Sequence, residues 1–187
     1  MRWDDLFDDL VAQARTVEAG GVAAEVDDRS RWELGQLDVN DRVLASADDT
    51  VQVVLVDGTT VGGGVGAAGR DWLAIREPHG DALVPVAAVA RLTWSTRPRP
   101  AGAPGRERAR LGLVQVFRQA ARDRAYVRLA LRGGHVAAGT VDAAGADHVQ
   151  LAEHEVETPR RHGVVRSVSL VPYSALLVAR GDGRWLR

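Results

Sequence analysis

The fold is decided by two stretches that resemble each other: Val51-Gln-Val-Val-Leu-Val-Asp-Gly-Thr-Thr-Val-Gly-Gly-Gly-Val65 and Val127-Arg-Leu-Ala-Leu-Arg-Gly-Gly-His-Val-Ala-Ala-Gly-Thr-Val141. A shift of 76 residues aligns Val51–Glu77 with Val127–Glu153 without a gap, and ten of the 27 aligned positions are identical. Random pairing at this composition would give about two or three identities. The identical pairs are Val51/Val127, Leu55/Leu131, Gly58/Gly134, Gly63/Gly139, Val65/Val141, Ala67/Ala143, Ala68/Ala144, Gly69/Gly145, Asp71/Asp147 and Glu77/Glu153. The chain therefore contains a duplicated unit.

The duplicated unit has the pattern of β-structure. Aliphatic residues alternate with more variable neighbours and are followed by the turn sequences Asp57-Gly58 and Gly133-Gly134, which predicts hairpin strands with one buried face. Further strands are predicted at 61–65, around Leu73 and Ile75, up to Val84-Pro85 and at 89–94, with counterparts in the second copy. A sheet this small leaves no edge unpaired only when it curls, so the sequence predicts two tandem five-stranded barrels, a mainly β fold with helices.

Amphipathic spacing predicts a helix ahead of each barrel and a helical arm at the N-terminus. In residues 107–123 a stripe at spacings of three and four is expected to face the core; it consists of Leu111, Val114, Phe117 and Ala121. Residues 37–47 show a weaker pattern. The predicted organisation is an acidic helical arm at 1–36, a first barrel at 37–96, a linker rich in Pro, Gly and Arg at 97–106, and a second barrel at 107–187 with a charged loop inserted at 154–166.

A helix followed by five strands, with V-x-h-x-L-x-x-G-x-x-h-x-G-x-V (h, apolar) in the first hairpin, resembles the Sm-like (LSm) small-barrel fold, an SH3-like roll. The resemblance covers about residues 40–96 and 110–180. Sm-like proteins that bind RNA carry an Asp and then an Asn after the second strand, and a basic pair before the last strand. The corresponding stretches here, Gly69-Arg-Asp71-Trp72 and Gly145-Ala-Asp147-His148, contain no Asn, and the last turns contain no basic pair. The resemblance thus implies tandem Sm-like barrels without inherited RNA binding.

Composition excludes several classes of protein. There is no cysteine, so disulfides and thiolate zinc sites are excluded. No apolar run approaches the roughly 20 residues that a membrane-spanning helix needs. The start of the chain, with Asp4 and Asp5, differs from the basic start of a signal peptide. These features predict a cytoplasmic protein without a membrane partner.

No pattern predicts catalysis. Gly64-Val-Gly66-Ala-Ala-Gly69 matches G-x-G-x-x-G, but no helix is expected after it, and the second copy has Thr140 and Asp142 in place of its first two glycines. His148, His154 and His162 stand near acidic residues, and we interpret this region as a charged surface loop rather than a metal site. Neither a G-x-S-x-G elbow nor a cysteine nucleophile is present. We expect no enzyme activity, no cofactor and no metal.

Two hypotheses for a partner remain. All 24 basic residues are arginine; residues 1–100 have a charge balance of −7, and residues 101–187 a balance of +6. The favoured hypothesis is a binding or assembly module that self-associates or binds another protein, with candidate interface residues Trp3, Phe7, Leu10 and Trp32 in the arm. The alternative is binding of RNA or DNA through Arg97, Arg99, Arg106, Arg108, Arg110, Arg118, Arg122 and Arg128.

Overall fold

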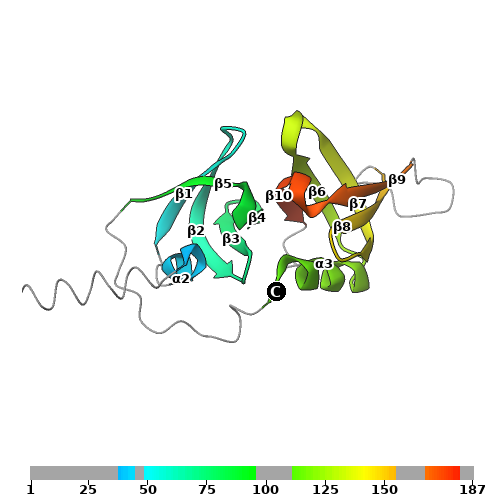
Figure 1. Ribbon diagram of the computed structural model, residues 1–187, viewed down its shortest axis with the longest axis horizontal. Helices are drawn as coiled ribbons and strands as arrows, with labels where there is room; N and C mark the ends of the chain where they lie inside the picture. Colours follow the sequence, from blue (N-terminus) through cyan, green and yellow to red (C-terminus); the bar gives the residue numbers. More distant parts are fainter. Residues whose placement is uncertain (1–37, 45–48, 96–110, 155–166, 182–187) are drawn as a thin grey trace, which may run out of the picture. The chain divides into compact units, whose positions relative to one another are not determined.

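The computed structural model describes four segments of the chain, 38–44, 49–95, 111–154 and 167–181, which belong to one compact unit (Figure 1). We call residues 38–95 the first copy and residues 111–181 the second copy. The predicted arm, the linker at 97–106 and residues 155–166 of the inserted loop lie outside the described residues. In the described part of the chain, no helix is long and apolar enough to cross a membrane.

The two copies contain the same strands in the same order. The first copy consists of α2 (Val39–Leu44), β1 (Thr50–Leu55), β2 (Thr60–Ala68), β3 (Trp72–Glu77), β4 (Gly80–Pro85), the 3-10 turn η1 (Val86–Ala88) and β5 (Val89–Trp94). The second consists of α3 (Leu113–Arg122), β6 (Tyr126–Leu131), η3 (Arg132–Gly134), β7 (Val136–Ala144), β8 (His148–Glu153), β9 (Ser167–Pro172), η4 (Tyr173–Ala175) and β10 (Leu176–Gly181). The predicted duplication and five strands per copy are confirmed.

All the strands that the structure describes belong to one antiparallel sheet. Its order is β5-β1-β2-β3-β4-β10-β6-β7-β8-β9, so β4 of the first copy pairs with β10 of the second. The mainly β prediction is confirmed. Two separate closed barrels are not confirmed, because the sheet is open and runs continuously from one copy into the other.

The long strand β2 changes partner along its length. Thr60–Gly64 pair with β1, and Gly64–Ala68 pair with β3, with a bulge between Val65 and Ala67. A Cβ atom built on Gly63 would lie 2.1 Å from the backbone oxygen of Arg76 in β3, so only glycine fits there. Strand β7 repeats this arrangement, with Gly139 as close to the backbone of β8.

The predicted alternation of β1 is confirmed, because Val51, Val53 and Leu55 are buried. The predicted helix in the second copy begins later than expected among the described residues, at Leu113, and packs against β7. Its buried residues are Leu113, Phe117 and Ala120, whereas Leu111 is 48% exposed. The predicted stripe is therefore confirmed at Phe117 and at Ala121, which packs against the core cluster, and is wrong at Leu111, because Leu111 precedes the helix and cannot share its periodicity.

Candidate assembly interface

The junction between the two copies is an antiparallel strand pair. Leu83 and Ala82 of β4 stand opposite Ala179 and Arg180 of β10. Strand β10 also pairs with β6, so it hydrogen-bonds to a strand of its own copy on one side and to the first copy on the other. The backbone thus joins the copies as neighbouring strands of a sheet join each other.

Apolar side chains from each copy enter the core of the other. Trp72, Ala74 and Leu83 of the first copy belong to the apolar cluster that Phe117 of α3 and the second-copy strands form. In return, Leu177 and Val178 of β10 belong to the cluster of the first copy. All of these side chains are at least nine-tenths buried. The junction therefore has the packing of a protein core rather than of a contact between separate domains.

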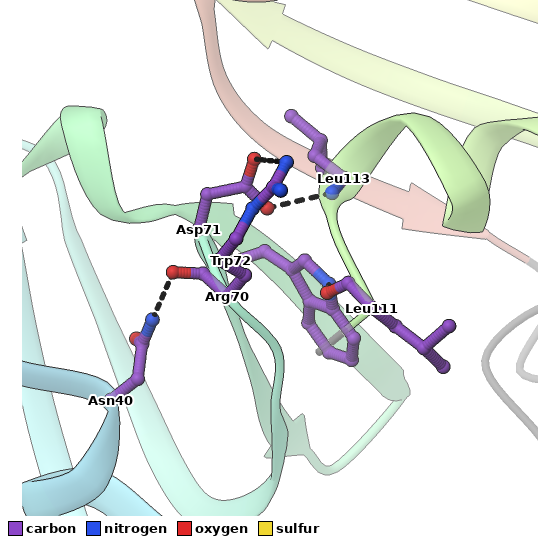
Figure 2. A network of polar contacts seen from close by, with 6 residues as sticks. All are labelled: Asn40, Arg70, Asp71, Trp72, Leu111 and Leu113. Carbon is purple, nitrogen blue, oxygen red and sulfur yellow. Dashed lines mark hydrogen bonds and ion pairs between the residues drawn. The ribbon is translucent and has the colours of Figure 1, made fainter. Parts of the chain in front are cut away.

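A polar clasp adds to this packing (Figure 2). The loop after β2 holds the chain as it enters α3: the Asp71 carboxylate accepts the Leu113 N–H at 2.7 Å, and the Trp72 indole N–H donates to the Leu111 carbonyl at 2.9 Å. The Arg70 N–H donates to the same carbonyl, and the Asn40 amide of α2 donates to the Arg70 carbonyl. Asp71 thus satisfies an N–H at the start of a helix that belongs to the other copy.

Charged side chains also cross the junction. Arg180 of β10 donates two hydrogen bonds to the Glu77 carboxylate, at 2.7 and 2.9 Å. These bonds raise the pKa of the Arg180 guanidinium above its ordinary value. Arg132 donates to the carbonyls of Ser174 and Ala87, one in each copy. Bidentate pairs of this kind fix orientation as well as adding energy.

Removing the ion pair is expected to weaken the junction modestly. Both side chains are partly exposed, so we expect a coupling of about 1 kcal/mol between Glu77→Ala and Arg180→Ala in a double-mutant cycle of urea unfolding. Subtracting the effects of the two single variants from that of the double variant leaves the coupling between the two side chains. Additive single effects would show that the pair contributes nothing to the junction.

In the described part of the chain, the second copy presents the same edge without a neighbouring strand. Strand β9 occupies the position of β4, so Leu170 corresponds to Leu83 and Ser169 to Ala82. Among the described strands β9 pairs only with β8, and at the other end of the sheet β5 pairs only with β1. Leu83 is 0% exposed and Leu170 is 62% exposed, and Val168 beside it is 60% exposed. The surface that is covered in the first copy is open in the second.

The loop that forms the clasp is also open in the second copy. Asp147 and His148 correspond to Asp71 and Trp72, but here the His148 imidazole hydrogen-bonds the Asp147 carboxylate at 2.8 Å. This bond lowers the pKa of Asp147 below its ordinary value. Nearby, Tyr173 stacks on Phe117 at 5.6 Å between ring centroids, and burial raises the pKa of Tyr173 to about 12.

The predicted nucleic-acid residues do not gather on one face in the described part of the chain. Arg118 and Arg122 are exposed on α3, which packs on the core side of the second-copy strands. Arg128 lies between Val127 and Leu129 of β6, which face the core. Its side chain therefore points to the opposite face of the sheet. Arg97, Arg99, Arg106, Arg108 and Arg110 lie outside the described residues, as do the arm residues Trp3, Phe7, Leu10 and Trp32.

One predicted surface residue is buried. His154 begins the predicted exposed loop, yet it is at least nine-tenths buried, and its ring forms a 2.8 Å hydrogen bond with the Thr140 hydroxyl. The prediction was wrong at this residue because histidine can be buried once a polar partner satisfies its ring nitrogen. Within the described segments no cluster of three or more His, Cys, Asp or Glu could hold a metal ion.

Sequence reasoning missed the junction residues, because the repeat shows only which positions of the two copies correspond. Asp71 and Asp147 are identical in the alignment. The Val84-Pro85 and Val171-Pro172 pairs align Leu83 of the first copy with Leu170 of the second. In comparisons with known proteins, no family model and no curated protein matches this chain.

Proposed function

We propose that this protein is a non-catalytic assembly module that self-associates through the open edge of β9. The observation that carries the proposal is the contrast between two equivalent leucines, Leu83 buried in the junction and Leu170 exposed at the edge. Leu83 is buried because β10 lies beside β4. A strand of another chain beside β9 would bury Leu170 in the same way.

The composition of β9 supports this function. Its sequence, Ser167-Val-Ser-Leu-Val-Pro172, contains no charged residue, and its only proline is its last residue. Proteins usually protect a free edge with charge, with proline inside the strand, or with a covering segment, because an uncovered edge pairs with other chains. An edge with two exposed aliphatic side chains and no charge favours strand addition.

The same features support the resemblance to Sm-like small barrels. In each copy the last strand pairs with the first, and the long second strand bends at a glycine from one partner to the next. This arrangement favours a curled, barrel-like form for each copy within the continuous sheet. As an assembly module, the protein would act through its strand edges rather than through a catalytic site.

A charge placed on the edge is expected to abolish association. We expect the average mass of the wild-type protein in sedimentation equilibrium to rise with concentration, and Leu170→Lys to remain monomeric, because its ammonium would have to be buried beside an apolar strand. Val136→Lys is the matched control, because it charges another exposed valine away from β9. A wild-type protein that stays monomeric, or a Leu170→Lys variant that associates like the wild type, would refute the proposal.

A further inference from the structure

We infer that the first copy binds an uncharged sugar in an open cleft that is formed by β1, β2, β5 and the end of β3. The cleft has a volume of about 740 Å³, within the range of roughly 300–1,000 Å³ that is usual for small-molecule sites. Its walls include Trp94 at the end of β5 and Pro78 in the turn after β3. The site does not use the edge of β9, so this inference is independent of self-association.

Glycine residues hollow out one side of the cleft. Gly62 and Gly63 line it, and Gly64 follows them opposite Thr50 of β1. The backbone of β3 excludes a side chain at Gly63, but a Cβ atom would have its nearest non-neighbouring heavy atom at 3.9 Å on Gly62 and at 4.0 Å on Gly64. Packing therefore does not require glycine at these two positions. Such a glycine inside a strand is typical of a place that a ligand approaches closely.

The second copy fills the corresponding space with side chains. Tyr126, Thr140 and His154 occupy the positions of Thr50, Gly64 and Pro78. The Thr140 hydroxyl and the His154 ring share a hydrogen bond of 2.8 Å, and the Tyr126 ring packs edge-on against the His154 ring at 5.4 Å between centroids. Thr140 and His154 are both at least nine-tenths buried. The same fold thus closes this space in one copy and leaves it open in the other.

One wall of the cleft carries a hydrogen-bond donor without an acceptor. The indole nitrogen of Trp94 is buried, and it has no hydrogen-bond partner in the described part of the chain. An indole nitrogen can only donate, and a buried donor that is left unpaired costs free energy. Trp94 stands opposite Val51, where the second copy has Gly181 opposite Val127. The donor is therefore a feature of the open copy, and a ligand oxygen would supply the missing acceptor.

The other polar groups of the lining carry no net charge. Four residues contribute hydroxyl or amide groups that both donate and accept hydrogen bonds; they are Thr50, Gln52, Thr93 and Ser95. The two charged residues of the lining, Arg76 and Glu77, have opposite signs. Each has a partner in the protein, because Arg76 donates to the Val65 carbonyl. Glu77 accepts from Arg180. The lining therefore favours an uncharged ligand.

A neutral sugar ring combines the groups that this cleft requires. Its hydroxyl oxygens accept hydrogen bonds, which the Trp94 indole needs, and its hydroxyl groups donate to the hydroxyl and amide oxygens of the lining. Its C–H face is apolar and packs against the rings of Trp94 and Pro78. A phosphate or carboxylate ligand would instead need a lining with a positive balance, which this one does not have.

Titration of the isotope-labelled chain with neutral sugars, followed by NMR, tests the inference. We expect the indole N–H resonance of Trp94, identified by its loss in Trp94→Phe, to shift with at least one of glucose, galactose, mannose, N-acetylglucosamine, maltose and cellobiose. Glycerol should leave it in place, because glycerol has hydroxyl groups but no ring face. The Trp72 resonance is the internal control, since its indole N–H already donates to the Leu111 carbonyl.

Filling the cleft with second-copy side chains is the matched test. We expect Thr50→Tyr combined with Gly64→Thr to raise the dissociation constant of the sugar by more than about tenfold, because the two side chains occupy its space. Gly64→Thr alone should weaken binding with little effect on folding, since its Cβ atom has room. Thr60→Tyr is the control, because it places the same ring on an exposed threonine of β2 outside the cleft.

The outcomes decide the inference. Trp94→Phe keeps an aromatic ring but removes the indole N–H, so the dissociation constant, followed by amide resonances of β1 and β2, should rise about tenfold. If no sugar of the panel shifts the Trp94 resonance, or if glycerol shifts it equally, the inference is wrong. It is also wrong if Gly64→Thr, folded by circular dichroism, binds the sugar as tightly as Thr60→Tyr does.

Discussion

Replacing Leu83 with alanine is expected to lower the free energy of unfolding by about 3 kcal/mol, whereas the same replacement at Leu170 should change it by less than about 0.5 kcal/mol. The two leucines occupy equivalent positions in the duplicated unit. Leu83 is completely buried between the copies and would leave a cavity in the second-copy cluster, but Leu170 already faces solvent. Urea unfolding in dilute solution, where we expect no association, measures both effects.

The comparison between the two sites is also its own control, since the substitution is chemically identical. Similar losses at both positions would show that Leu170 is buried in the isolated chain, and the argument from an open edge would fail. At high concentration, Leu170→Ala should weaken association, because the exposed side chain that it removes is the one expected to be covered there.

The second large effect is expected at Gly63. Gly63→Ala places a methyl group 2.1 Å from the backbone oxygen of Arg76 and 3.1 Å from the Ile75 side chain. Because a backbone atom cannot move aside as the end of a flexible side chain can, β2 and β3 must separate, at an expected cost of about 3 kcal/mol. Thermal or urea unfolding measures the loss, and Gly139→Ala should reproduce it in the second copy.

Gly62→Ala is the matched control, one residue earlier in the same strand. A Cβ atom there would have as its nearest neighbour the Val51 carbonyl oxygen at 3.9 Å, an ordinary contact. Alanine also restricts the unfolded chain, so this variant should be neutral or slightly more stable. Equal losses of stability in Gly62→Ala and Gly63→Ala would contradict this prediction. The need for glycine in β2 would then come from the flexibility of the strand and not from its close approach to β3.

Local features of the sequence predicted the strands well. Alternation at a period of two identified β1 and its buried face, and the glycine turns after β1 and β6 have positive φ at Gly58, Gly133 and Gly134. Pro85 and Pro172 were expected at strand ends, and both close their strands before a 3-10 turn. The helix was harder to place, because the aliphatic residues around Leu111 fit more than one phase of a 3.6-residue period.

Periodicity and the duplication by themselves determined that the described segments form ten short strands in two equivalent sets, because alternation and turn chemistry act between neighbours in the chain. Only the tertiary structure decided that β4 pairs with β10 and that Leu83 is covered while Leu170 is not. Glu77 and Arg180, which meet across that junction, are 103 residues apart. Which edge finds a partner depends on how two folded surfaces fit, and a repeat pattern that is the same in both copies cannot specify that difference.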